Sequence, residues 1–445
     1  MHKVLPLASV VKYRVIVRLP EILHILMIEY VGNTKTHRFM AITMFRVSIN
    51  RIEEYLASVL CFLLIYNISF TAFPRATTAR VALVIGLLYI GLFRITEFSR
   101  IFRKTKVVML LFLPALYTIP LYITSGDYGV IARFLNLYLY AIVGSTIIVT
   151  LISNFERALL VVFSVIVLQA VFIWLSFLSF GFQMFLDQNV VSGANYDVFY
   201  IYRASGFSGS SGAALSVIQG LGVMLVWLYV RLNRSISFSK AVLMFFGTLL
   251  VISSIIVVGR TGLFLAGIFL LFIVFDSGLS KFKIVQMIIV SVGTVVLFML
   301  NLYKFLPDSF DLDWFSGWVS SAFTSNTTTE FLLDGFPEFS SQMWVGSGQV
   351  SLVEGANPSG SDSGYGQFVF AYGLPMAILF YGAYIFSLFK ITKYCSLFAR
   401  LSLIVVFLAL DFKEPFLMKY SMFTVLMIIY LAHLKGSYKV IKLKF

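Results

Sequence analysis

The sequence predicts an all-α, polytopic integral membrane protein, and three observations lead to this fold class. Of its 445 residues, 60% are hydrophobic and only 12% are charged, and the mean hydropathy is +0.93. Soluble domains carry roughly 45–50% apolar and about 25% charged residues, so an ordinary globular enzyme is excluded. The apolar residues also gather in long runs, and a helix needs about 20 of them to cross a bilayer.

Twelve apolar runs are candidate transmembrane helices. Three of them are short or interrupted by charge, so the expected number is about 12 within a range of 10 to 13. In chain order the runs are 55–73, 81–97, 107–123, 128–152, 158–180, 212–230, 241–258, 261–275, 284–302, 367–389, 397–410 and 416–434.

The basic residues predict the orientation of these helices. Lys and Arg cluster in alternate connections, which the positive-inside rule assigns to the cytoplasm, so both termini are expected there. Two long periplasmic loops follow, at 181–211 and 303–366, within a transmembrane domain of residues 55–434. Residues 1–54 form a cytoplasmic or interfacial segment or precede the true start, and 435–445 form a basic cytoplasmic tail.

The net charge of +14 does not indicate a nucleic-acid partner. The basic residues lie between apolar runs, where they set orientation or face the anionic headgroups of bilayer lipids. Arg94 and Glu97, three residues apart, are expected to form an ion pair near the cytoplasmic boundary. The two cysteines, Cys61 in an apolar run and Cys395 in a basic linker, provide neither a disulfide framework nor a metal site. We expect no cofactor and no metal.

A glycine-rich stretch ends the larger loop. Residues 346–366 read GSGQVSLVEGANPSGSDSGYG, and glycines allow tight turns and a close approach of the backbone to a ligand. Such a loop can turn its N–H groups toward an anion, although the same composition also suits a flexible linker.

Arginines on the periplasmic side suggest which anion is bound. Arg203 lies just before the run at 212–230, and Arg260 lies in a turn of almost no length between two runs. An arginine at the centre of a membrane helix costs about 2.5–3.5 kcal/mol, so it usually faces a protein cavity or a partner. Two guanidinium forks match a phosphate or pyrophosphate, and Arg133 could join them, whereas Arg203 could instead contact lipid headgroups.

These features together resemble the O-antigen polymerase (Wzy) family, which is related to the O-antigen ligases. The resemblance covers the hydropathy layout of nearly the whole chain after residue 54. It also covers three short patterns, which are Arg203 with Gly206 and a Gly/Ser run, Arg260 with Thr261 and Gly262, and the 346–366 stretch followed by Phe368 and the AYGLP turn at Ala371 to Pro375.

The resemblance implies a glycosyl transfer at the periplasmic face of the bacterial inner membrane. Repeat units built on undecaprenyl pyrophosphate would be joined there, with lipid pyrophosphate leaving and no nucleotide sugar involved. Arg203, Arg260 and Arg133 would hold the pyrophosphate, and its charge stabilisation would ease departure. A flippase and a chain-length regulator of the same pathway are the expected protein partners.

A carboxylate would act as general base on the acceptor hydroxyl. Asp362 and Glu354 are the main candidates because they lie in the glycine-rich stretch, and Asp334, Glu338 and Asp411 are alternatives. Residues expected to contact saccharide or shape the loop are Tyr365, Asn357 and Asp411.

Two other functions compete with polymerisation. An O-antigen ligase is expected to use a histidine in its large periplasmic loop, but the four histidines here are His2, His24, His37 and His433, near the chain ends. A flippase or transporter for the same lipid-linked oligosaccharide would need polar residues at mid-membrane depth in many helices, and most apolar runs here are almost free of charge.

Overall fold

The computed structural model describes residues 35–74, 76–105, 112–191, 204–233, 236–276, 342–351, 358–361, 363–393 and 396–442, and these are almost entirely helical. The β-type pairs among them are isolated bridges of Phe70 with Phe73 and Val190, so the all-α prediction is confirmed for this part of the chain. The elements are α2 (Lys35–Tyr66), α3 (Thr78–Tyr89), η1 (Ile90–Arg94), α4 (Ile95–Phe102), α5 (Phe112–Ser125), α6 (Gly129–Asn136), η3 (Leu137–Gly144), α7 (Ser145–Leu151), α8 (Phe155–Leu178), α9 (Phe180–Asn189), α10 (Gly212–Leu232), α11 (Phe238–Val258), α12 (Arg260–Asp276), α16 (Gln342–Val345), α17 (Gly364–Tyr372), α18 (Leu374–Ile391), α19 (Leu397–Lys413) and α20 (Tyr420–Lys442).

In the described part of the chain, five helical segments are long and apolar enough to cross a membrane, which indicates a membrane-embedded protein. They are Thr78–Thr105, Gly129–Leu151, Phe155–Leu178, Gly212–Leu232 and Phe238–Val258. Each coincides with one of the predicted runs. Shorter apolar helices, Thr261–Val274, Leu374–Lys390 and Tyr420–Gly436, match three more. The predicted run 284–302 lies outside the described residues, and the total of twelve stays a prediction.

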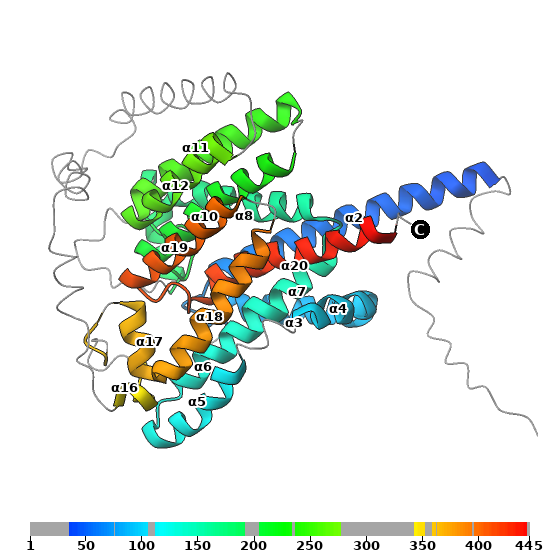
Figure 1. Ribbon diagram of the computed structural model, residues 1–445. Coiled ribbons are helices and arrows are strands. Elements are labelled where there is room, and N and C mark those ends of the chain that lie inside the picture. Colours follow the sequence, from blue (N-terminus) through cyan, green and yellow to red (C-terminus); the bar gives the residue numbers. More distant parts are fainter. Residues whose placement is uncertain are drawn as a thin grey trace, which may run out of the picture.

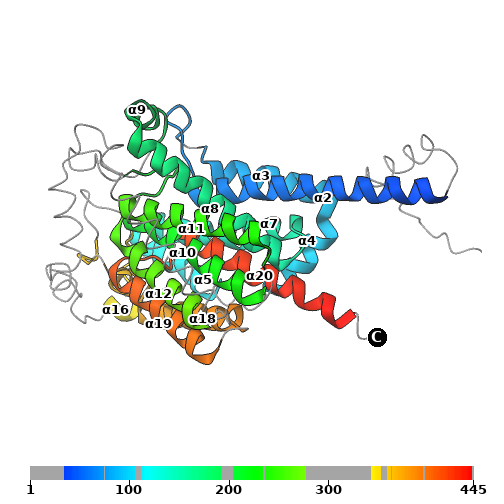
Figure 2. The ribbon, with the colours of Figure 1, turned by 90° about the horizontal axis from the view of Figure 1, so that it is seen from above.

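The helices form a bundle around α10. Nearly all of the apolar part of α10 is buried, because α8, α11 and α12 pack against it (Figure 1). On the other side, α2 and α20 run side by side, and both extend beyond the other helices in Figures 1 and 2. Two π-helical segments, η1 and η3, interrupt the helices that contain them.

The structure departs from the predicted layout in two helices. The predicted run 367–389 is two helices, α17 and α18, because the chain turns at Gly373, where φ is +84° and a Cβ would lie 2.6 Å from the carbonyl oxygen of Trp344. The predicted run 55–73 ends early, because α2 stops at Tyr66 and Asn67 adopts a positive φ of 40°.

The predicted segment boundaries differ as well. The boundary between residues 54 and 55 falls inside α2, which begins at Lys35. The predicted loop 181–211 contains most of α9, and the predicted loop 303–366 holds α16, just before its glycine-rich stretch, and the start of α17. Most of the rest of that loop lies outside the described residues.

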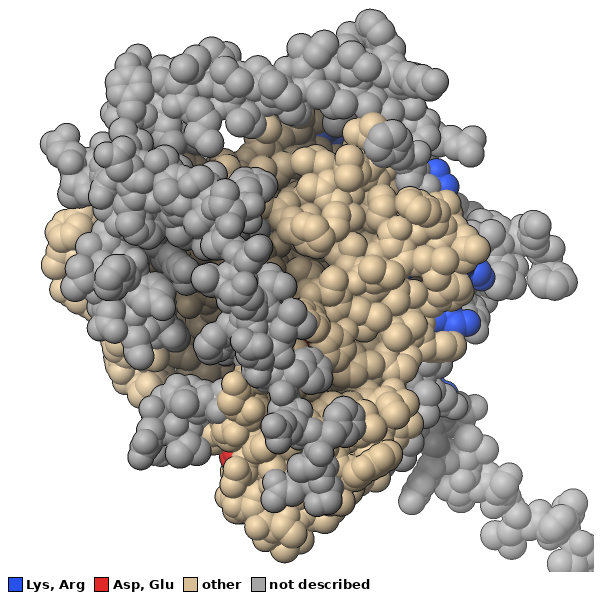
Figure 3. All heavy atoms as spheres, turned by 60° about the vertical axis from the view of Figure 1, so that its left-hand side comes forward, with Lys and Arg blue, Asp and Glu red and all other residues tan. Residues whose placement is uncertain are grey.

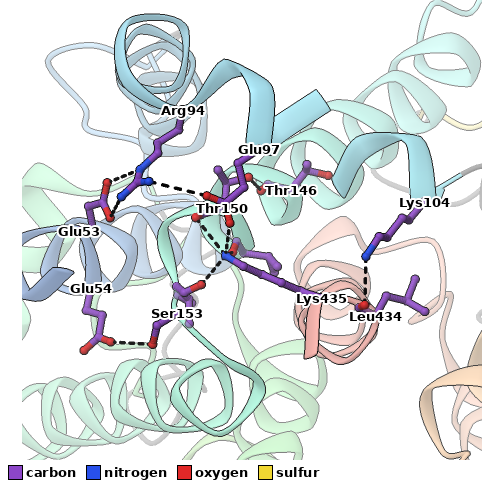
Figure 4. Close-up of polar contacts among 12 residues, drawn as sticks. Glu53, Glu54, Arg94, Glu97, Lys104, Thr146, Thr150, Ser153, Leu434 and Lys435 are labelled. Atoms are coloured by element: carbon purple, nitrogen blue, oxygen red, sulfur yellow. Dashed lines mark hydrogen bonds and ion pairs between the residues drawn. The ribbon is translucent and has the colours of Figure 1, made fainter. Parts of the chain in front are cut away.

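Charged side chains concentrate at one end of the bundle, which we call the basic end (Figure 4). Arg94 forms a bidentate pair with Glu53, with both N–O distances at 2.7 Å, and the predicted pair of Arg94 with Glu97 is present at 3.8 Å. Lys435 binds Glu97 at 2.8 Å and donates to the carbonyl oxygens of Val149, Thr150 and Ile152. Side chains from α2, η1, α4 and α20 therefore meet the carboxyl end of α7 there.

The outer surface is apolar between the two ends. Figure 3 shows a broad face of uncharged atoms with Lys and Arg mainly along one margin. Exposed aromatic rings occur near both ends, such as Tyr55 and Phe238 at the basic end and Phe73 and Phe180 at the opposite end. Such rings favour the boundary between lipid headgroups and acyl chains, which agrees with a bundle set in a bilayer.

The buried ion pair yields a stability prediction. Glu53 is 3% exposed, and Glu53→Gln would remove the bidentate partner of Arg94 and leave Glu97, at 3.8 Å, as its carboxylate partner. Loss of one member of a buried pair costs several kcal/mol, and since the Arg94 side chain is 35% exposed we expect a loss of about 2 kcal/mol. Thermal unfolding in detergent measures this loss. Glu54→Gln is the matched control, because the Arg157 partner of Glu54 is 56% exposed and lies at 3.8 Å, so it should cost under about 0.5 kcal/mol.

Candidate functional site

The end opposite the basic end gathers glycine-rich segments from distant parts of the chain. The helices α2, α8 and α20 run between the two ends, so Tyr66 and the start of α20 lie far from Lys435 and Glu53. We call this the glycine-rich end. Its described parts are 204–212, 259–262, 346–351 and 358–361 with 363–366.

The starts of α10 and α12 lie side by side at the glycine-rich end. A Cβ on Gly259 would lie 3.2 Å from the carbonyl carbon of Gly212, and a Cβ on Gly262 would lie 2.1 Å from the carbonyl oxygen of Ser216. The N–H of Gly262 also donates to Ser216 Oγ at 3.0 Å. Glycine at position 262 is therefore required by the packing of these helices. Arg260 is the first residue of α12, and its side chain lies outside the described residues.

The segment that leads into α10 is fastened to α8. Arg203 itself lies outside the described residues, which resume at Ala204. Gln169 on α8 donates from Nε2 to the carbonyl oxygen of Ser205 at 2.8 Å. The ring of Phe207 packs against Phe172, with ring centroids 4.9 Å apart.

The same segment is fastened to α2. The N–H of Gly209 donates to the carbonyl oxygen of Tyr66 at 2.8 Å. A Cβ at Gly209 would lie only 2.4 Å from the carbonyl oxygen of Asn67, so the backbones approach too closely for any other residue. The Gly/Ser run before α10 is thus a fixed segment rather than a linker.

Asp127 holds the first part of the 346–366 stretch. Its Oδ2 accepts hydrogen bonds from the N–H groups of Val350 and Ser351, both at 2.7 Å, and its Oδ1 accepts from Ser351 Oγ at 2.6 Å. The N–H of Gly129 also donates to Oδ1. Burial opposes ionisation of Asp127, but these hydrogen bonds outweigh it and lower the pKa of the carboxyl to about 2.

Arg133 adds a second contact to this segment. Its Nη2 donates to the carbonyl oxygen of Val350 at 3.0 Å, next to the residues that Asp127 holds. The structure therefore places Arg133 at the start of the glycine-rich stretch, and its predicted contact with pyrophosphate stays a prediction.

Asp411 lies beside the second part of the stretch. The side chain is fully buried, accepting from the Tyr381 hydroxyl at Oδ2 and from the N–H of Leu417 at Oδ1 at 2.9 Å. A Cβ on Gly364 would lie 2.6 Å from the carbonyl oxygen of Asp411. The Tyr365 hydroxyl donates to the carbonyl oxygen of Leu408, and its ring lies 4.8 Å from that of Tyr381. Asp411 and Tyr365 thus lie together in the corner between α17, α18 and α19.

The predicted bases Asp362 and Glu354, the alternatives Asp334 and Glu338, and the predicted saccharide contact Asn357 also lie outside the described residues. The residue that the sequence reasoning missed is Asp127. Its local signal was the turn Asp127-Tyr128-Gly129, in which the carboxylate accepts from the N–H two residues later, as in an Asx turn. Its partners at 350 and 351 are more than 200 residues away and left no signal.

The glycine-rich end combines the starts of α10 and α12 with a glycine-rich segment that the Asp127 carboxylate holds. Helix starts carry unpaired N–H groups and a partial positive charge, and they favour anions. No group of three His, Cys, Asp or Glu side chains in the described part of the chain is placed to hold a metal ion. No protein family model matches the chain, and no curated protein and no solved structure is significantly similar to it.

The Asp127 contacts predict a pH dependence of stability. The pKa of this carboxyl is lowered from 3.8 to about 2 in the folded state, so its stabilising contribution is present above pH 4 and is lost as the pH falls through 2. Asp127→Asn should cost about 1 kcal/mol at pH 7, a figure reduced for partial solvent exposure. The difference from the unsubstituted protein should narrow as the pH falls from 4 toward 2.

Thermal unfolding of the detergent-solubilised protein across this pH range makes the comparison. Asp187→Asn on the exposed side of α9 removes the same charge without such contacts and should change stability little. Equal losses in the two variants would contradict the role given to Asp127.

Proposed function

We propose that this protein polymerises undecaprenyl-pyrophosphate-linked oligosaccharide repeat units into an O-antigen or capsule-like polysaccharide at the periplasmic face of the bacterial inner membrane. The observation that supports it most is the meeting of the α10 and α12 starts at the glycine-rich end. Arg260 begins one of these helices, and Arg203 precedes the fixed segment that enters the other.

The positive electrostatic potential expected at the adjacent starts of α10 and α12 favours binding of a pyrophosphate. The N-cap residue of α10, Ser211, makes no side-chain capping bond, so the first N–H groups of the helix are not used by their own cap. Two adjacent helix dipoles add their positive ends, and arginine forks add full charge. Lipid pyrophosphate would leave more easily from such a site because the charge that develops on it is stabilised.

The glycine-rich stretch would supply the acceptor side of the reaction. An acceptor hydroxyl attacks the anomeric carbon of the donor sugar, the bond from that carbon to the pyrophosphate oxygen breaks, and the hydroxyl proton passes to a carboxylate. Asp362 and Glu354 are the proposed bases, with Asn357 and Tyr365 beside the saccharide. Asp127 holds the start of the stretch, and Gly364 near its end packs against the backbone of Asp411, which limits movement of the stretch during transfer.

Orientation follows from charge. With the basic end in the cytoplasm, as the positive-inside rule requires, the glycine-rich end faces the periplasm. The apolar outer surface leaves the polyisoprenoid chain of the donor free to remain in the bilayer (Figure 3). A flippase would deliver the donor to that face, and a chain-length regulator would act on the product.

Arg260 provides the sharpest test of this function. If its guanidinium grips pyrophosphate through two parallel hydrogen bonds, an ammonium keeps the charge but loses the fork. Arg260→Lys should therefore lose most polymer and Arg260→Ala nearly all, in a deletion strain whose lipopolysaccharide carries a single repeat unit. A silver-stained gel of lipopolysaccharide measures the ladder.

The matched control for this test is Arg157→Lys at the basic end, where Arg157 pairs with Glu54. The control should leave the ladder unchanged. A full ladder from Arg260→Lys at normal expression would reject the bidentate contact, and an unchanged ladder in the deletion strain would reject the polymerase function altogether. Loss of every repeat unit on deletion would instead favour a ligase or a flippase.

The proposed orientation has its own test. Single cysteines at Ser205 and Ser347, in a cysteine-free background, should react with a membrane-impermeant thiol reagent added to intact spheroplasts, and a cysteine at Lys240 should not. Lys240 lies at the basic end, 3.6 Å from Glu156. The reverse pattern of labelling would place the glycine-rich end in the cytoplasm and exclude periplasmic polymerisation.

A further inference from the structure

The outer face of α3, η1 and α4 is the least covered part of the described bundle. Only 22% of the apolar window of the helical segment Thr78–Thr105 is buried, the smallest share among the five membrane-length segments. A stripe of large side chains is exposed along it, with Leu88 at 63%, Leu92 at 71% and Ile95 at 56%. In a bilayer this stripe contacts acyl chains.

Cations gather where this stripe reaches the basic end. Arg100 and Arg103 on and after α4 are exposed, and Arg100 and Lys435 both lie close enough to Lys104 to repel its ammonium group. The nearby carboxylate that the structure pairs with this group is Glu97, which Lys435 binds at 2.8 Å and Arg94 approaches at 3.8 Å (Figure 4). The cluster of Arg100, Arg103, Lys104 and Lys435 therefore carries an excess of positive charge.

The apolar stripe leads into the helix that carries the arginines. The backbone leaves α-helical geometry at Arg94, where φ is −135° and ψ is 18°, so α4 turns away from the line of α3 (Figure 2). Along α4, Ile95, Ser99 and Arg103 follow each other at intervals of four, which brings them onto one face, and Arg100 lies beside them. The exposed side chains of α3 and η1 therefore end next to the arginines.

We propose that this surface binds an anionic phospholipid. Its phosphate lies between the Arg100 and Arg103 guanidinium groups, and an acyl chain lies along Leu88, Leu92 and Ile95. A lipid is favoured over a protein partner because the cations are confined to one end of an exposed apolar face, which complements a molecule with one charged head and long apolar tails. This inference needs only the membrane setting and does not depend on the polymerase reaction.

Native mass spectrometry of the full-length protein in detergent tests this binding. The protein is titrated with a phosphatidylglycerol and, separately, with a phosphatidylcholine that has the same acyl chains. Phosphatidylglycerol should bind more tightly, and the Arg100→Gln/Arg103→Gln variant should weaken its binding about 30-fold, since each basic side chain near the surface contributes about fivefold. Phosphatidylcholine binding should be unaffected.

The matched control is Arg157→Gln/Lys240→Gln, which removes two charges at the same end from residues already paired with Glu54 and Glu156. The control should keep its preference for phosphatidylglycerol. If the double variant does not fold, Arg103→Gln alone should weaken binding about fivefold. Equal binding of the two lipids, or an equal loss in the control, would overturn the proposal. A dimer that Arg100→Gln/Arg103→Gln converts to a monomer would also overturn it, because a second copy of the chain would then cover this face.

Discussion

Water exclusion inside the bundle is the constraint on which the rest of this structure depends. A backbone carbonyl or a charge that leaves water must find its partner within the protein, since an unpaired group in hydrocarbon costs several kcal/mol. At the end of α7, the Lys435 ammonium group donates hydrogen bonds to three carbonyl oxygens and forms an ion pair with one carboxylate. Glu53 receives two bonds from Arg94 and one from Tyr89 for the same reason. The charged side chains at the basic end therefore join several helices to one another, in addition to indicating the orientation of the protein in the membrane.

The opposite end meets the same constraint by different means. Close backbone approach at Gly209 and Gly262 lets main-chain and hydroxyl groups satisfy one another without charge. This packing also sets two helix starts side by side. The Asp127 carboxylate holds the start of the 346–366 stretch, and the Asp411 carboxylate joins Tyr381 and Leu417 beside its end. Glycine richness, which in sequence also suits a linker, here accompanies close contact. That close contact makes the backbone at this end of the bundle rigid, as the proposed binding of a charged ligand requires.

Sequence reasoning located the membrane helices because hydrophobic length is a local property. It foresaw α10 and α11 within a few residues, and it foresaw the proximity of Arg94 to Glu97, which are three residues apart. It named a turn at Ala371 to Pro375 but still drew one helix over 367–389, because the crowding of Gly373 by the distant carbonyl of Trp344 leaves no local pattern. Nor could it join Asp127 to Ser351, since a contact across 224 residues has no periodicity. The roles of Asp362, Glu354 and Arg203 are still inferred from sequence alone.

The π-helical segment η3 has a consequence for how one transmembrane helix serves both ends. A π-helical turn holds more residues than an α-helical turn, so the eight residues from Leu137 to Gly144 rotate the two halves of this helix relative to an unbroken α-helix. The first half thereby aims Arg133 at Val350, and the second half aims Ser145 at the carbonyl oxygen of Thr424 in α20. One continuous helix can therefore meet two different packing patterns, one at each end of the bundle, because the wide turns between them set the relative rotation of its halves.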